Sequence, residues 1–248
     1  MSISIKQETE ICHKFAFFWV GENISIPECL VKSIMHIYKK DFYIYQLTDR
    51  KTKKINGVSE VVRLELPDEI MLARLHAYKA INDQDMLIYL DADSLIINYV
   101  DLPKKNPAPI YLVKRNDNAT IINHNYPEFY PEFYKKKFID VMPLFFGFIA
   151  TNNGHSFLND LLILAENLPK RFHRWYGDQI ALNEFFKTNP KKFEILNEDQ
   201  YLFLAKKLLN RNEILNLKNQ GTKIVTFKGN LSKNFIEETL KELINEEN

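Results

Sequence analysis

A run of five apolar residues, Met86–Leu90, leads directly into Asp91 and Asp93, and the chain turns apolar again at Leu95. Such a run is typical of a strand buried on both faces of a parallel sheet. Open α/β sheets bind ligands at the carboxyl ends of their strands, where these two carboxylates fall. Two unpaired carboxylates repel each other and lose hydration, and a divalent cation shared with phosphate oxygens removes both costs. The segment predicts a metal–diphosphate site; a solvated turn that caps a helix is the alternative.

Strands and helices alternate on the amino-terminal side of this segment. We expect helices from Pro27 to Lys39 and from Pro67 to Ile81, and strands at Phe15–Val20, Phe42–Leu47 and Val58–Leu66. Proline suits the first turn of a helix. The alternation is the βαβ pattern of an α/β protein with a Rossmann-like, mostly parallel sheet flanked by helices.

The second half of the chain is less regular. The expected strands are Ile110–Lys114, Leu144–Ala150, Phe193–Leu196 and Lys223–Phe227, and the expected helices are Phe157–Leu168, Asp178–Lys187, Tyr201–Leu209 and Leu231–Ile244. The last helix carries balanced charges, so we expect it to pack on the protein rather than on a membrane. The length predicts one domain, residues 1–248, which ends in the C-terminal helix (231–248).

Composition excludes several classes of function. The net charge of +1 offers no global field for nucleic acid, and no Gly-rich phosphate loop of the Walker or dinucleotide type is present. Cys12 and Cys29 have no metal-ligand spacing and suggest free thiols in a reducing compartment. The chain has neither a signal-peptide core nor an apolar run long enough to span a bilayer. We expect a cytoplasmic protein, with contact at the inner face of the membrane left open.

Several segments recur in an order that is known from one group of enzymes. They are Ala73–Leu75, the Leu-Asp-Ala-Asp of residues 90–93, Phe146–Ile149, Gly177–Asn183 and Ile224–Gly229. Over residues 15 to 233 the chain resembles nucleotide-sugar glycosyltransferases of the GT-A fold, and most of all the glycogenin and bacterial lipopolysaccharide galactosyltransferase group. The resemblance implies a mixed, mostly parallel GT-A-like sheet. It also implies that the single domain has a nucleotide-binding half (15–97) and an acceptor and closing half (98–233).

The resemblance also implies roles for individual residues. Asp91 and Asp93 would hold Mn²⁺ or Mg²⁺, with Asp91 also close to the ribose and diphosphate of the donor. Arg74, Lys228 and Lys233 would bind the donor phosphates. An arginine fork suits phosphate, although a surface arginine paired with Glu69 or Asp68 is the alternative.

Asp178 and Gln179 match the acidic and amide pair that faces the transferring sugar in this family. The residues alone leave another explanation open, because Gly-Asp before an apolar helix also makes a good N-cap. The chain departs from the family pattern at three places. Thr226 stands where the family has a histidine metal ligand, Lys233-Asn234-Phe235 replaces Lys-Pro-Trp, and Phe146 replaces an asparagine.

The predicted activity is transfer of a hexose from a nucleotide sugar, expected to be UDP-linked, to a saccharide or lipid-linked saccharide acceptor of a cell-surface glycan such as lipopolysaccharide or capsule. The basic, aromatic segment Lys170–Tyr176 either contacts such an acceptor or is a solvated connector whose aromatic rings cover the core.

Three other functions share parts of the pattern. A haloacid-dehalogenase-type phosphatase also ends a strand in Asp-x-Asp, with the first aspartate as nucleophile, but that motif usually lies near the start of the chain. A nucleotidyltransferase usually has a Gly-rich loop after its first strand, and Gly21-Glu22-Asn23 is not one. A non-catalytic sugar-nucleotide-binding module is the third alternative.

Overall fold

The computed structural model describes residues 13–105, 109–116, 120–121, 131–152 and 154–245. Its strands are β1 (His13–Phe18), β2 (Phe42–Thr48), β3 (Glu60–Arg63), β4 (Met86–Leu90), β5 (Ser94–Ile96), β6 (Ile110–Lys114), β7 (Leu144–Asn152), β8 (Phe193–Asn197), β9 (Phe203–Leu204) and β10 (Ile224–Thr226). Its helices are α1 (Ser25–Tyr38), α2 (Ile70–Lys79), α4 (Phe138–Val141), α5 (His155–Glu166), α6 (Arg171–Arg174), α7 (Gly177–Thr188), α8 (Glu198–Tyr201), α9 (Arg211–Asn219), α10 (Asn230–Lys233) and α11 (Ile236–Ile244), with a 3₁₀ turn at Pro190–Lys192.

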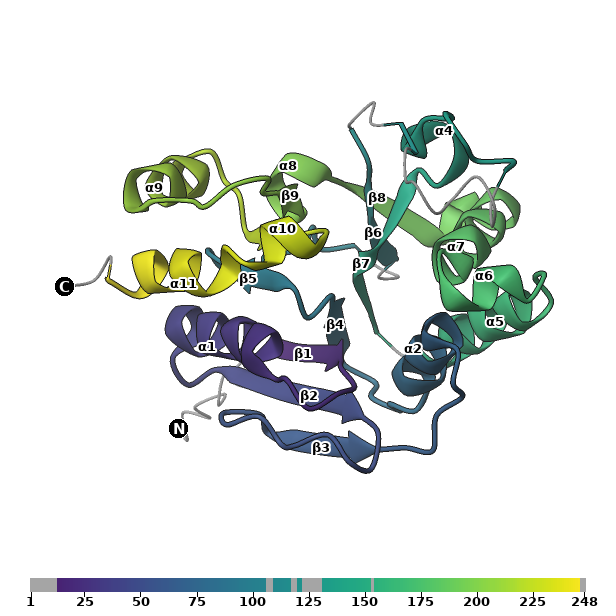
Figure 1. Cartoon of the computed structure of the whole chain (residues 1–248), viewed down its shortest axis with the longest axis horizontal. Helices are drawn as coiled ribbons and strands as arrows, with labels where there is room; N and C mark the ends of the chain where they lie inside the picture. The colour runs from purple at the N-terminus through teal and green to yellow at the C-terminus, as the bar shows by residue number, and fades with distance from the viewer. Residues whose placement is uncertain (1–12, 106–108, 117–119, 122–130, 153, 246–248) are drawn as a thin grey trace, which may run out of the picture.

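The strands form two sheets (Figure 1). The larger has the order β3-β2-β1-β4-β7-β6-β8, and the smaller has the order β5-β10-β9. Strands β3, β2, β1 and β4 run parallel, whereas β7 is antiparallel to both of its neighbours, β4 and β6. The predicted α/β class and the mixed, mostly parallel GT-A-like sheet are confirmed.

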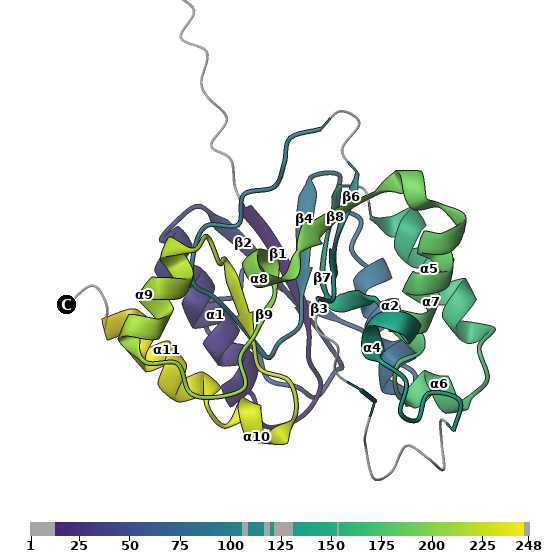
Figure 2. The ribbon, with the colours of Figure 1, turned by 90° about the horizontal axis from the view of Figure 1, so that it is seen from above.

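Both faces of the large sheet are covered, which explains the apolar runs in the sequence. Along β1, Phe15 and Phe17 pack toward α1, whereas Ala16 and Phe18 pack toward α2, α5 and α7. Figure 2 shows these helix groups on opposite sides of the sheet. Strand β4 alternates in the same way and is buried along nearly its whole length. A strand with two buried faces delivers its next residues to the end of the sheet, where polar groups can meet a ligand.

The small sheet packs against α9 and α11 on the α1 side of the large sheet. Together with Cys29 of α1 they form a third apolar cluster. Cys29 of α1 belongs to this cluster as a free, buried thiol, and burial raises its pKa to about 11. Cys12 lies outside the described residues. None of the helices within the described residues is long and apolar enough to cross a membrane.

Three predicted elements need correction. The predicted strand Val58–Leu66 is shorter in the structure, where β3 pairs only with β2 at the edge of the sheet. The predicted helix Tyr201–Leu209 is wrong: Phe203 pairs with Val225 in a strand, and the next helix, α9, starts after the capping box of Asn210. Such a box fixes a helix start more strongly than apolar spacing does.

The predicted C-terminal helix is divided. Helix α10 ends at Lys233 and α11 begins at Ile236, while residues 246–248 lie outside the described part. The side chain of Lys233 is thereby directed to Asp93 at the end of β4. The break between α10 and α11 therefore helps to position Lys233 in the site described below.

A buried hydroxyl joins α1 to β5. The Ser33 hydroxyl donates to the Leu30 carbonyl at 2.7 Å and accepts the Ile96 N–H at 3.0 Å, and Ser33 is fully buried. We expect Ser33→Ala to lower the free energy of unfolding by about 1–3 kcal/mol, because it leaves a buried N–H without a partner. Urea denaturation measures the change.

Ser59→Ala is the matched control. The Ser59 hydroxyl also accepts a strand N–H, from Ile44, but Ser59 is exposed and water can replace it. The control should lose less stability, and equal losses in the two variants would contradict the account.

Candidate functional site

The pairing of β5 with β10 brings two distant segments together where β4 ends. Thr226 lies opposite Ser94 in this antiparallel pair, and the Phe227 N–H donates to the Asp93 carbonyl at 2.9 Å. Thr226 is fully buried, with its hydroxyl 3.5 Å from the same carbonyl. The next residue along the chain, Lys228, therefore emerges directly beside the Asp-x-Asp segment.

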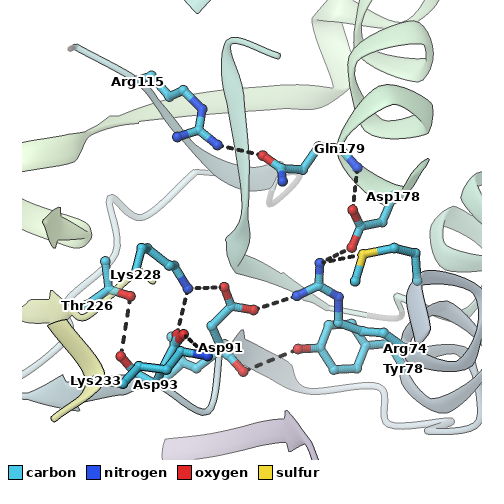
Figure 3. A network of polar contacts seen from close by, with 12 residues as sticks. Arg74, Tyr78, Asp91, Asp93, Arg115, Asp178, Gln179, Thr226, Lys228 and Lys233 are labelled. Carbon is cyan, nitrogen blue, oxygen red and sulfur yellow. Dashed lines mark hydrogen bonds and ion pairs between the residues drawn. The ribbon is translucent and has the colours of Figure 1, made fainter. Parts of the chain in front are cut away.

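Lysine side chains contact both aspartates (Figure 3). The Lys228 ammonium donates to Asp91 Oδ2 and, at 2.6 Å, to Asp93 Oδ1. The Lys233 ammonium lies 3.2 Å from Asp93 Oδ2. The structure thus brings together four residues that the sequence assigned to one donor site from segments more than 130 residues apart.

Arg74 of α2 completes the group. Its Nη1 donates to Asp91 Oδ1 at 2.6 Å, its Nη2 donates to Asp178 Oδ2, and its guanidinium lies 4.6 Å from the centre of the Phe146 ring. Arginine recognises carboxylates through this fixed fork of donors. Arg74 thus forms ion pairs with Asp91 and Asp178 in place of the alternative pairing with Asp68 or Glu69.

Helix α7 carries the other two predicted residues. Tyr176 precedes it with φ of 66°, a left-handed conformation that bulky residues rarely adopt. Gly177 then passes so close to the Phe172 carbonyl that a Cβ atom would collide with it. These two residues fix the start of α7 and hence the directions of Asp178 and Gln179.

Asp178 and Gln179 differ in their surroundings. The Asp178 carboxylate is fully buried behind Arg74 and also accepts the Gln179 N–H at 2.7 Å, in the first turn of a helix whose N-cap is Tyr176. Gln179 reaches the cavity wall, and its Oε1 accepts a hydrogen bond from Arg115 Nη2 at 2.6 Å. Asp178 can therefore act on a ligand through Arg74, whereas Gln179 can act directly.

The neighbouring cations determine the charge state of Asp91. Burial alone raises the pKa of Asp91, but the positive charges of Lys228 and Arg74 outweigh it and lower that pKa to about 2. Burial likewise opposes the charge of Lys228, and the two aspartates overcome this and raise its pKa. Both side chains are therefore ionised at neutral pH.

Gly147 leaves room for the Asp91 carboxylate because it has no side chain. Strand β7 shifts register against β6 near this glycine, and the Asp91 N–H donates to the Gly147 carbonyl at 3.0 Å. A Cβ atom at Gly147 would lie 2.7 Å from Asp91 Oδ2. Backbone and carboxylate thus approach each other in a way that only glycine permits.

A cavity of about 1010 Å³ opens above the cluster. Typical small-molecule sites have volumes of about 300–1,000 Å³. Its walls include Trp19, Arg74 and the Asp-x-Asp segment, together with Arg115, Trp175, Tyr176 and Gln179.

The segment Lys170–Tyr176 contributes to the core and to this wall. Phe172 and Tyr176 are buried in an apolar cluster, in agreement with a connector whose rings cover the core, whereas Trp175 is 47% exposed and lines the cavity.

The two aspartates fit a divalent cation. The Lys228 ammonium already lies between the two carboxylates and contacts one oxygen of each. Carboxylate oxygens are also the ligands that Mg²⁺ and Mn²⁺ prefer. Within the described ranges, no cluster of three or more His, Cys, Asp or Glu side chains could hold a metal. Phosphate oxygens and water would complete the coordination of a metal held by Asp91 and Asp93.

Comparison with known proteins bears on the fold. No protein-family model matches the chain, and no curated protein matches its sequence. Among solved structures, a glycosyltransferase involved in the glycosylation of the major capsid of PBCV-1 aligns over 92% of this chain and 98% of its own, with a TM-score of 0.55 and 12% identity. The galactosyltransferase LgtC, in complex with donor and acceptor sugar analogs, aligns over 94% of this chain and 95% of its own, with a TM-score of 0.54 and 13% identity. The chain has the GT-A glycosyltransferase fold.

A third similar structure is the glycosyltransferase GlyE of Streptococcus pneumoniae TIGR4, with a TM-score of 0.56 and 16% identity over 94% of this chain and 63% of GlyE. At such identities the similarity establishes the GT-A fold that the sequence resemblance implied. The roles of individual residues rest on the geometry given above.

Sequence reasoning missed two contributors to this site. Arg115 directly follows β6 and donates a hydrogen bond to Gln179, which lies far along the chain. No local sequence pattern indicates this contact. Gly147 was noticed only as part of a motif, although an isolated glycine inside an apolar strand signals a close approach or a bulge. That signal could have identified the contact with Asp91.

We expect Gly147→Ala to raise the pKa of Asp91 from about 2 toward the ordinary value of about 3.9. The new Cβ displaces the carboxylate from Lys228 and Arg74, whose charges lower its pKa. A carboxyl ¹³C NMR titration measures it. Gly154→Ala, where the Cβ would lie 2.8 Å from Thr151 Cγ2, is the matched control and should leave the value unchanged. An unaltered Asp91 titration in Gly147→Ala would refute this account.

Proposed function

We propose that this protein is a metal-assisted glycosyltransferase that moves a hexose from a nucleotide sugar, most simply a UDP-sugar, to a saccharide acceptor of a cell-surface glycan. One observation carries the proposal. Two aspartates at the end of a central strand, bound by cations from three other segments, line a ligand-sized cavity in a GT-A fold.

The charges suit a diphosphate leaving group. When bound by Asp91 and Asp93, Mn²⁺ or Mg²⁺ would neutralise the negative charge that develops on the diphosphate as its bond to the sugar breaks. Lys228 and Lys233 are long, flexible donors within reach of phosphate oxygens at the same place. Arg74 keeps Asp91 ionised and oriented, and Gln179 presents its amide to the cavity where the sugar would lie.

The cavity walls support a sugar acceptor. Trp19, Trp175 and Tyr176 line the same cavity as the two aspartates. Aromatic rings offer large, rigid contact surfaces that suit stacking on a nucleotide base or on a saccharide ring. LgtC was solved with donor and acceptor sugar analogs, and the PBCV-1 enzyme is a glycosyltransferase involved in the glycosylation of the major capsid. These neighbours support a saccharide acceptor, which in lipopolysaccharide or capsule synthesis would be soluble or lipid-linked.

The phosphatase alternative fits the geometry less well. It requires Asp91 to attack a phosphorus atom, yet both of its carboxylate oxygens are bound, one by Arg74 and one by Lys228. Nucleophilic attack would require one of these cations to leave Asp91, and the GT-A fold favours the transferase. Turnover of a nucleotide sugar distinguishes the transferase from the non-catalytic binding module.

We expect Asp91→Asn and Asp93→Asn each to abolish release of UDP from a UDP-hexose, and chelation of divalent metal to do the same to the unaltered protein. Each change removes a charge that holds the cation on the diphosphate. A coupled assay for UDP, run over a panel of UDP-hexoses, measures turnover, and circular dichroism verifies folding. Asp85→Asn, at the exposed amino end of the same strand, is the control and should retain activity.

We expect Asp178→Asn to lower turnover by roughly tenfold or more and to lower UDP affinity less, because the lost contact is one charge-assisted hydrogen bond to Arg74. Steady-state kinetics give the first quantity and calorimetry gives the second. If affinity and turnover fall by the same factor, Asp178 positions Arg74 for nucleotide binding alone, and the expectation is wrong.

A further inference from the structure

Every carboxylate oxygen of the Asp-x-Asp pair already has a cationic partner. Arg74 lies 2.6 Å from Asp91 Oδ1, and Lys228 contacts Asp91 Oδ2. On the neighbouring aspartate, Lys228 lies 2.6 Å from Asp93 Oδ1 and Lys233 lies 3.2 Å from Asp93 Oδ2. A divalent cation that binds both carboxylates must therefore displace at least one ammonium group.

The cluster is also electrically balanced without a metal. It contains three cationic and three anionic side chains, namely Arg74, Lys228, Lys233, Asp91, Asp93 and Asp178. A divalent cation that arrives alone adds two positive charges beside the ammonium groups of Lys228 and Lys233, and in a partly buried site such repulsion is weakly screened. A divalent cation that arrives with a sugar-nucleotide diphosphate adds almost no net charge.

We propose that Lys228 is a built-in counter-ion that competes with the divalent cation for Asp91 and Asp93 and releases them when a nucleotide diphosphate offers its ammonium group new oxygen partners. The inference rests on the proposed function, because it takes the ligand to be a nucleotide diphosphate. The ammonium exchanges two carboxylate oxygens for phosphate oxygens, so it loses no strong partner. Metal binding is then coupled to nucleotide binding, and by linkage each ligand strengthens the other by the same factor.

Lys228 is better placed for this exchange than Lys233. It is the residue that bridges both aspartates, and its side chain is 31% exposed toward the cavity that the diphosphate would enter. Lys233 contacts one oxygen of Asp93 at a longer distance. Removing the charge of Lys228 should therefore free more of the metal position than removing the charge of Lys233.

Titration of Mn²⁺, followed by electron paramagnetic resonance in the absence of nucleotide, tests the inference on the purified full-length protein. Lys228→Met retains most of the side-chain volume and removes the charge. We expect it to bind Mn²⁺ at least tenfold more tightly than the unaltered protein does, and Lys233→Met to show a smaller gain. Lys206→Met is the matched control: Lys206 is exposed on the wall of the same cavity and belongs to none of the ion pairs of the two aspartates, so the control makes the same change in charge and should alter Mn²⁺ affinity less than twofold.

A second titration in the presence of UDP completes the cycle. The ratio of the Mn²⁺ dissociation constants without and with UDP should fall at least tenfold in Lys228→Met, since the competitor is gone. Unchanged or weaker Mn²⁺ binding by nucleotide-free Lys228→Met, or an equal gain in Lys206→Met, would overturn the counter-ion role while leaving the proposed function intact. Failure of the unaltered protein to bind Mn²⁺ even with UDP would overturn both. Thermal unfolding verifies that each variant is folded, and Lys228→Gln repeats the test if Lys228→Met is not.

Discussion

Two carboxylates at the end of a buried strand are stable here because cations from three other segments reach them. Asp91 and Asp93 would otherwise repel each other in a partly buried position, and Lys228, Lys233 and Arg74 remove that cost. The same contacts tie α2, α10 and the segment after β10 to the end of β4. The charged cluster therefore organises the closing part of the chain as well as the candidate site.

The fold serves this cluster through two backbone features. The small sheet pairs β5 with β10, which places the segment after Thr226 beside Asp93. The register shift in β7 places Gly147 against Asp91, where a side chain would not fit. Both features bring backbone close to the two aspartates and so fix the positions of the charged side chains.

Sequence reasoning succeeded where the signal is local. The runs Met86–Leu90 and Ile110–Lys114 are strands with the predicted ends, because apolar runs bounded by polar residues mark buried strands well. The pairing of Phe203 with Val225 and the ion pair between Arg74 and Asp178 join residues far apart in sequence, and no local pattern encodes them. The two aspartates could be predicted from the sequence, whereas the bridging position of Lys228 could not, since it depends on how β10 pairs.

A crystal structure of the protein with UDP and Mn²⁺, with data collected at the manganese absorption edge, tests the central claim most directly. The account predicts an anomalous peak between the carboxylates of Asp91 and Asp93, with the Lys228 ammonium moved from them to the diphosphate. A manganese peak elsewhere, or UDP bound while Lys228 still bridges both aspartates and no manganese lies between them, would contradict it.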